Sequence, residues 1–372
     1  MKSKLLFLLL LLGSSYITAQ TVIENPPFET RQGSIHTISK IELSPTETRL
    51  TIRTVFRPQW WTSLDSLTYI YAPESKKQLY PLRIEGRKFG EQVTTPASGI
   101  IEDDCVITYP PLPEGTTRID WMDDNLNSET NTYGILLVKP QETKEQASLR
   151  KIHGNWQQAD AQNGWDIGIY DSLAIMDNRF WKYDLCRKQG KKFKLNLKDE
   201  TGEQCLLEIT QEKDGNLCIG KNGGKANKYI RAGRPQRNYA ATTAATAPQT
   251  AFFRKDTVHI RGFLDGYSPK LGFTTVLIYT DNHITNEGTP AVVTIHPDGR
   301  FESDFVVNYP GVHHLSMGNN WMTFYIRPGE TLMLYINWED HLDYLRQRRL
   351  KPMLTETCLL YTSPSPRDGA TS

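Results

Sequence analysis

The residues that could carry redox chemistry are the cysteines, of which the chain has five. No Cys-x-x-Cys pair occurs among Cys105, Cys186, Cys205 and Cys218, so these positions form no redox motif. Disulfides would be possible in an oxidising compartment, and Cys205 and Cys218 flank one expected hairpin. Because they are not mirror images about the turn at 214–215, we favour buried free thiols over a bridge there. The pairing of Cys186 stays open.

Phosphate and metal sites are the next candidates. Residues 215–222 have the spacing of a phosphate-binding loop, but Asn222 stands where Ser or Thr would ligate magnesium. The residues between the glycines read as a strand, whereas the motif needs a loop before a helix. The eight histidines include no His-Glu-x-x-His, and Asp120, Asp123 and Asp124 lack the ladder of a calcium loop. We therefore expect no catalytic residue, no metal site and no cofactor here.

Five of the eight tryptophans are candidate ligand or domain contacts. Trp60 and Trp61 are adjacent, and on a strand one of them must face outward, where it could stack on a ligand or dock a neighbouring domain. Burial under a loop or between domains is the alternative. Trp156, Trp165 and Trp181 lie in an expected small barrel and could line a cavity for an apolar ligand, although small barrels are usually filled by their own side chains.

Composition and charge limit the kinds of protein that this chain can be. The 372 residues include 43 Lys and Arg and 42 Asp and Glu, a formal net charge of +1, with 38% apolar and 10% aromatic residues. This apolar content supports packed cores and excludes a chain that is disordered throughout. The charge balance gives no electrostatic reason to expect nucleic acid or an anionic membrane surface as the main partner.

The N-terminus has the three parts of a secretory signal peptide, which we assign to residues 1–19. Lys2 and Lys4 precede an apolar run at 5–12, and small residues precede a cleavage site before Gln20. No later stretch approaches the roughly 20 apolar residues of a membrane-spanning helix. No lipoprotein cysteine follows the cleavage site. We expect a periplasmic or secreted protein with no integral membrane segment after signal cleavage.

The C-terminal residues 358–372 are expected to be foreign to the protein. The run from Cys358 to Asp368 reads like one translation frame of a common transposase-based sequencing adaptor. A natural Ser- and Pro-rich tail is the alternative. We expect the native sequence to stop at about Thr357, so that the natural C-terminal part is missing.

Alternating short strands between turn clusters predict a mainly β, multidomain chain. Residues 21–140 are expected to form a β-sandwich, followed by a charged linker at 141–151. Residues 152–231 open with Gly-Asn-Trp and continue as a meander of hairpins, which predicts a small up-and-down, lipocalin-like β-barrel.

A second sandwich follows the barrel. Residues 232–250 are an Ala-, Thr- and Pro-containing linker without apolar periodicity. Residues 251–338 alternate again around Gly-containing turns and predict the second β-sandwich. At 339–357 the pattern changes to the start of a helical segment.

Several segments resemble the N-terminal region of large TlpA-like envelope thiol-disulfide oxidoreductases of the thioredoxin-like family, over essentially all of residues 21–357. They are 22–29 (VIENPPFE), 56–61 (FRPQWW), 82–86 (LRIEG), 109–115 (YPPLPEG), 272–273 (GF), 298–301 (DGRF) and 327–332 (RPGETL).

The resemblance implies that a thioredoxin-fold domain with Trp-Cys-x-x-Cys follows in the complete protein. That domain is absent from this sequence, so no catalytic residue is carried over. The resemblance implies an accessory, non-enzymatic region whose partners are the missing domain and envelope protein substrates. The alternatives are a binding protein for glycan, peptide or lipid without redox activity, and a purely structural envelope protein.

Overall fold

The computed structural model describes residues 21–123, 130–138, 143–160, 165–232, 253–282, 285, 287–318, 320–350 and 361–362. The chain is mainly β and divides into two compact units, Met1–Lys139 with Leu342–Leu354, and Pro140–His341 with Thr355–Ser372. The predicted signal peptide at 1–19 and all of the linker at 232–250 except Ala232 lie outside the described residues.

The first unit contains a β-sandwich of two five-stranded sheets. One sheet has the order β1 (Thr21–Glu24), β3 (His36–Leu43), β4 (Thr48–Val55), β10 (Ile100–Tyr109) and β8 (Arg83–Glu85). The other has the order β2 (Thr30–Arg31), β12 (Thr132–Leu136), β11 (Arg118–Met122), β6 (Tyr69–Ala72) and β7 (Lys77–Leu79). A short pair, β5 (Trp61–Thr62) and β9 (Val93–Thr94), stands apart from both sheets.

The sandwich core lies between the two sheets. Leu50 and Ile52 of β4 are fully buried and pack with Trp121 and Ile119 of β11. Arg53, which follows Ile52 on the opposite face of the strand, points toward solvent, and its Nε donates to Glu102 at 2.7 Å. The alternation expected for a strand with one face inward is confirmed for Leu50, Ile52 and Arg53, whereas Thr51, on the other face, is buried as well.

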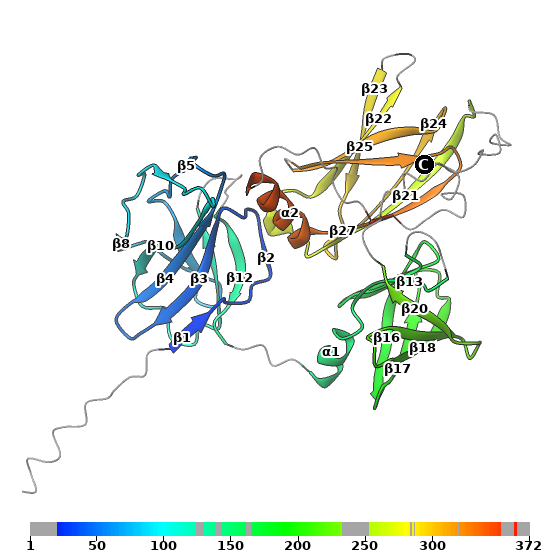
Figure 1. Ribbon diagram of the computed structural model, residues 1–372, viewed down its shortest axis with the longest axis horizontal. Helices are drawn as coiled ribbons and strands as arrows, with labels where there is room; N and C mark the ends of the chain where they lie inside the picture. Colours follow the sequence, from blue (N-terminus) through cyan, green and yellow to red (C-terminus); the bar gives the residue numbers. More distant parts are fainter. Residues whose placement is uncertain are drawn as a thin grey trace, which may run out of the picture. The chain divides into compact units, whose positions relative to one another are not determined.

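The second unit begins with the predicted barrel, which is confirmed as a closed eight-stranded meander (Figure 1). Its strands are β13 (Gly154–Gln158), β14 (Ile167–Ile169), β15 (Leu173–Met176), β16 (Arg179–Gln189), β17 (Lys192–Lys198), β18 (Gln204–Gln211), β19 (Leu217–Lys221) and β20 (Asn227–Arg231). Pairing of β13 with β20 closes the barrel. The segment expected to be a linker contains α1 (Lys144–Leu149), which Thr143 caps.

The second sandwich consists of two four-stranded sheets. Their orders are β24 (Arg300–Val307), β21 (Asp256–Asp265), β27 (Thr331–Asn337) and β28 (Tyr361–Thr362), and β23 (Glu287–Thr294), β22 (Thr275–Asn282), β25 (Gly311–Met317) and β26 (Asn320–Ile326). The predicted change to helix is confirmed by α2 (Trp338–Leu350), while residues 351–357 of the predicted helical segment lie outside the described residues. The two-residue β28 falls within the segment that the sequence assigns to an adaptor.

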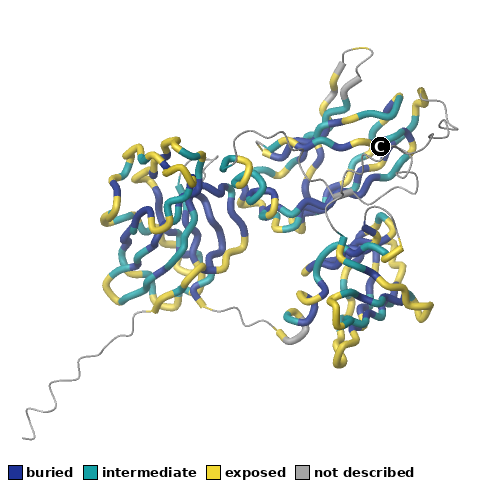
Figure 2. Tube along the Cα trace, viewed as in Figure 1, coloured by how far each residue is buried: buried dark blue, intermediate teal, exposed yellow. Residues whose placement is uncertain are grey.

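Buried residues follow the strand interiors, and exposed ones gather at turns and on outward strand positions (Figure 2). No helix in the described ranges is long and apolar enough to cross a membrane.

Candidate functional site

Trp60 and Trp61 are both half-exposed, at 49% each. The guanidinium of Arg57 lies 5.0 Å from the Trp60 ring centroid, a cation–π contact. The Thr95 hydroxyl donates to the carbonyls of Arg57 and, at 3.1 Å, of Trp60, which fixes the backbone of this turn. The backbone that carries the two rings is therefore fixed by hydrogen bonds, and about half of the surface of each residue is accessible to a ligand.

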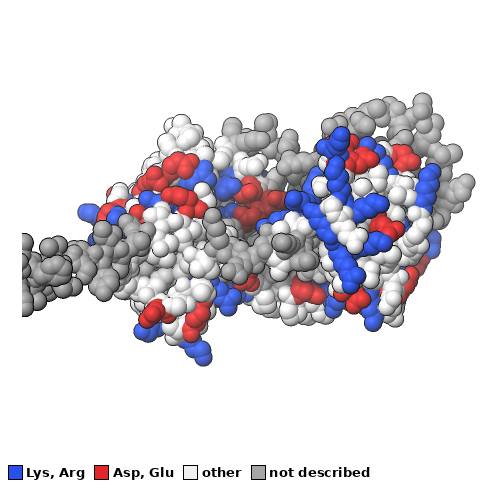
Figure 3. All heavy atoms as spheres, turned by 90° about the horizontal axis from the view of Figure 1, so that it is seen from below, with Lys and Arg blue, Asp and Glu red and all other residues white. Residues whose placement is uncertain are grey.

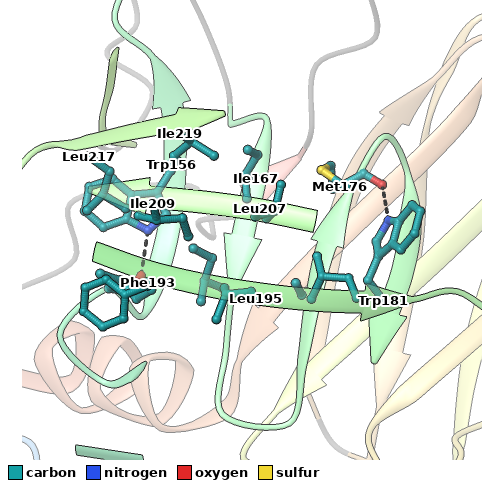
Figure 4. Packing of buried hydrophobic residues seen from close by; sticks show 14 of the residues in the cluster. Trp156, Ile167, Met176, Trp181, Phe193, Leu195, Leu207, Ile209, Leu217 and Ile219 are labelled. Carbon is teal, nitrogen blue, oxygen red and sulfur yellow. Dashed lines mark hydrogen bonds between the residues drawn. The ribbon is translucent and has the colours of Figure 1, made fainter. Parts of the chain in front are cut away.

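Trp156 and Trp181 lie inside the barrel (Figure 4). Trp156 is fully buried and its indole donates to the carbonyl of Ile152 at 2.8 Å. Trp181 is 3% exposed and donates to the carbonyl of Met176 at 3.1 Å. Both indoles thus have a backbone partner, as buried tryptophans require. They pack with apolar side chains from the surrounding strands, including Ile167, Phe193, Leu195, Leu207, Ile209, Leu217 and Ile219.

Trp165 has a different environment. It belongs to an apolar cluster that joins the barrel to the second sandwich, with Tyr170, Phe180, Phe263 and Tyr335 among its members. The rings of Tyr170 and Tyr335 stack with centroids 4.5 Å apart and planes at 11°. Trp165 is therefore part of a contact within the second unit, whereas Trp156 and Trp181 belong to the barrel interior.

A titratable group lies at the same contact. The hydroxyl of Tyr335 donates to the Asp265 carboxylate at 2.9 Å, and His153 Nε2 lies 3.9 Å from it. Burial raises the pKa of Asp265, since the charged form is poorly solvated there. The contact between the barrel and the second sandwich therefore includes these polar side chains beside its apolar ones.

The four cysteines of the described residues are free thiols. Burial raises the pKa of Cys105 to about 12 and also raises that of Cys205. The pKa of Cys218 is raised chiefly by its hydrogen bond to Glu212, whose Oε1 lies 3.2 Å from the sulfur. Because the thiolate is the reactive form, these three thiols are poorly suited to disulfide exchange.

A buried polar network in the first sandwich was not foreseen from the sequence. Arg87 Nη1 donates to Asp104 at 2.8 Å, and both side chains are almost fully buried. The Thr54 hydroxyl donates to the same carboxylate at 2.6 Å and lies 2.9 Å from His36 Nδ1. Since that hydroxyl has one proton, His36 Nδ1 must donate to it, and Nε2 accepts from Thr62 at 3.1 Å.

This network has the character of structural support. Burial, with a smaller contribution from the charge of Arg87, lowers the pKa of His36 to about 4, so the imidazole is neutral at pH 7. His36 is 3% exposed and both of its nitrogens are occupied by hydroxyl groups. No sequence motif predicts this network, because His36, Arg87 and Asp104 come together only through strand pairing. Within the described residues, no group of three or more His, Cys, Asp or Glu side chains could hold a metal ion.

A second exposed aromatic surface lies on the outer face of the second sandwich. Trp321 of β26 is 57% exposed and stacks on Tyr279 of β22, with ring centroids 5.0 Å apart. Val312 and Tyr325, on adjacent strands, are also exposed. Alternation within 320–326 would have placed Trp321 and Tyr325 outward, so the sequence did contain this signal.

Comparisons with known proteins add little. No family model and no curated protein matches the chain. Among solved structures, a pullulanase from Bacillus acidopullulyticus is similar at 9% identity and a TM-score of 0.16, over 79% of this chain and 34% of that chain. The chain thus spans about a third of that protein's length, and a likeness this weak carries no argument.

Proposed function

We propose that these residues are the accessory, non-catalytic region of an envelope thiol-disulfide oxidoreductase of the TlpA-like kind. Its role is to position a redox domain that follows in the complete protein. The proposal also places the protein in the periplasm, delivered by the signal peptide at 1–19. The motifs between residues 22 and 332 suggest the family. The properties of the thiols support a non-catalytic role for these residues beside a separate redox domain.

The state of the thiols is the observation that carries the non-catalytic role. Cys105, Cys205 and Cys218 all have raised pKa values, whereas an attacking thiol needs a substantial thiolate fraction near neutral pH. In the proposed arrangement these three thiols are not the redox centre, which belongs instead to the domain that follows.

The junction within the second unit supports a positioning role. Trp165 and Phe180 on the barrel pack against Phe263 and Met333 of the second sandwich, and Arg261 Nη1 donates to the carbonyl of Asn178 at 3.1 Å. Shared apolar burial and a direct hydrogen bond hold the two β domains together, as a spacer requires.

The deciding experiment is to read the source DNA across codon 357 until a genuine stop codon. A helical segment followed by a thioredoxin-like domain with Cys-x-x-Cys would support the proposal. An early stop or an unrelated domain would contradict it. In addition, purified residues 20–357 should not catalyse the reduction of a disulfide substrate, and turnover by them would overturn the accessory role.

The second candidate is a binding protein for glycan, peptide or lipid without redox activity. The half-exposed pair Trp60 and Trp61 favours it, because exposed indoles stack well on ligand rings. Binding of a glycan or lipid panel by the purified chain, abolished by Trp61→Ala, would support this function. A Trp321→Ala variant is the matched control, since it removes an exposed indole from another surface.

A further inference from the structure

The hairpin of β16 and β17 carries a local excess of positive charge, which is not apparent from the nearly neutral net charge of the whole chain. Between residues 179 and 198 there are eight Lys and Arg residues and one acidic residue, Asp184, although the whole chain has a net charge of +1. The charge balance of the whole chain gave no electrostatic reason to expect an anionic partner, but this hairpin has a local excess of positive charge. Gly190, with a φ of 62°, makes the turn between the strands, and Lys191 follows it at the tip.

The strand register places several of these cations on one outer face of the barrel. In β17 the inward residues Phe193, Leu195 and Leu197 are buried, so the alternate residues Lys192, Lys194 and Lys198 point outward. In β16 the residues directly opposite are Gln189, Arg187 and Lys182. In Figure 3 Lys and Arg side chains are prominent on the right-hand part of the view, with Asp and Glu side chains among them.

Two of these opposed pairs carry like charges. Arg187 lies opposite Lys194, and Lys182 lies opposite Lys198. Like charges directly across a strand pair are destabilising. Lys194 has a partner, Glu208, at 2.7 Å. Within the described part of the chain, Lys182, Arg187, Lys192 and Lys198 form no ion pair. The fold thus maintains a cationic face with an excess of positive charge, in which Lys194 pairs with Glu208 and Lys192 also interacts electrostatically with that carboxylate. We call it the basic face and define it as Lys182, Arg187, Lys192, Lys194 and Lys198.

The composition of the basic face favours one kind of partner. Four of its five cations are lysines, which attract anions as hydrated point charges and lack the planar fork of arginine. Leu185, 37% exposed, lies on β16 between Lys182 and Arg187 and adds an apolar contact. The outward residues of these two strands include no aromatic ring on which a nucleobase could stack. These features suit a broad anionic surface better than a single-stranded nucleic acid.

We propose that the basic face binds peripherally to a membrane surface rich in anionic phospholipid headgroups. Each Lys or Arg held near such a surface strengthens binding, and the attraction falls off within a Debye length. Adsorption would also relieve the repulsion between the opposed cations. This proposal is independent of the redox parentage suggested above.

Vesicle sedimentation of the full chain tests the proposal. The probes are phosphatidylcholine vesicles with and without one quarter phosphatidylglycerol, at low and at high salt. We expect binding to the anionic vesicles at low salt, release at high salt, and no binding to neutral vesicles. The variant K182Q/R187Q/K192Q/K198Q should bind the anionic vesicles at least about tenfold more weakly.

The matched control is K76Q/K77Q/K213Q/K225Q, which removes the same number of exposed cations elsewhere and should bind like the wild type. The test variant should unfold at the same temperature as the wild type or a higher one, because repulsion is removed. Absence of binding to anionic vesicles, or an equal loss in both variants, would overturn the proposal. Tighter binding of a single-stranded oligonucleotide than of the vesicles would assign the basic face to nucleic acid instead.

Discussion

The interiors of the first sandwich and of the barrel differ in how many charged and polar side chains they bury. Beside its apolar core, the sandwich buries an ion pair, Arg87 with Asp104, tied by hydroxyl groups to His36. The barrel interior contains a cluster of apolar side chains and two indoles, Trp156 and Trp181, whose N–H groups donate to backbone carbonyls. The sandwich therefore depends on directional polar contacts and on pH, and the barrel depends on volume.

Removing volume from the barrel should give the largest effect. Trp156→Ala should destabilise the barrel by about 3–5 kcal/mol through the cavity, and the lost hydrogen bond to Ile152 adds about 1 kcal/mol. Labelling of the buried Cys205 thiol in urea reports barrel opening, and Cys105 reports the sandwich. Of these two thiols, only Cys205 should become more reactive. Trp321→Ala, an exposed site, serves as control, and an equal effect of both variants would contradict a filled barrel.

Breaking the buried ion pair should destabilise the first sandwich about as much as Trp156→Ala destabilises the barrel. Arg87→Met leaves the Asp104 carboxylate buried without its counter-ion and should cost about 3–5 kcal/mol of sandwich stability. Cys105 labelling measures this loss, while Cys205 labelling stays unchanged.

The exposed pair of Arg49 and Glu85, 3.2 Å apart, provides the control for that substitution. Arg49→Met should cost less than about 1 kcal/mol, because solvent screens the pair. If Arg87→Met cost no more than Arg49→Met, the buried network would not be what distinguishes the sandwich from the barrel.

Lowering the pH should reduce the free energy of unfolding of the first sandwich, because the fold buries His36 in its neutral form. The fold lowers the pKa of His36 from 6.5 to about 4, so the unfolded chain takes up the proton first as pH falls. This contribution to stability is complete above pH 6.5 and is lost between pH 6.5 and 4, by up to about 3 kcal/mol. Hydrogen exchange of β3 and β4 amides, corrected for intrinsic rates, measures it. His36→Gln should flatten this pH dependence, whereas His259→Gln, at an exposed site, should leave it in place.

The sequence predicted local patterns well and long-range ones poorly. The alternation of Leu50, Ile52 and Arg53 and the hairpins of the barrel follow from period and turn chemistry, so the mainly β architecture was accessible. The partnership of Arg87 with Asp104 depends on strand pairing that no local pattern fixes.

The candidate tryptophans illustrate the same limit. Trp165 could be placed in the barrel segment, but only the packed structure shows that its ring faces the second sandwich. The basic face was missed for another reason. Its residues are close in sequence, but averaging the charge over the whole chain concealed them.

The smallest effect on stability is expected at Trp61. Its side chain is half-exposed and belongs to neither interior, so Trp61→Ala should change the free energy of unfolding by no more than about 0.5 kcal/mol. Cys105 and Cys205 labelling should therefore match the wild type. A loss above about 1 kcal/mol would show that the ring is covered in solution, and the case for a ligand-stacking residue would then fail. With stability unchanged, any binding that disappears in this variant can be assigned to the indole itself, because neither interior has been disturbed.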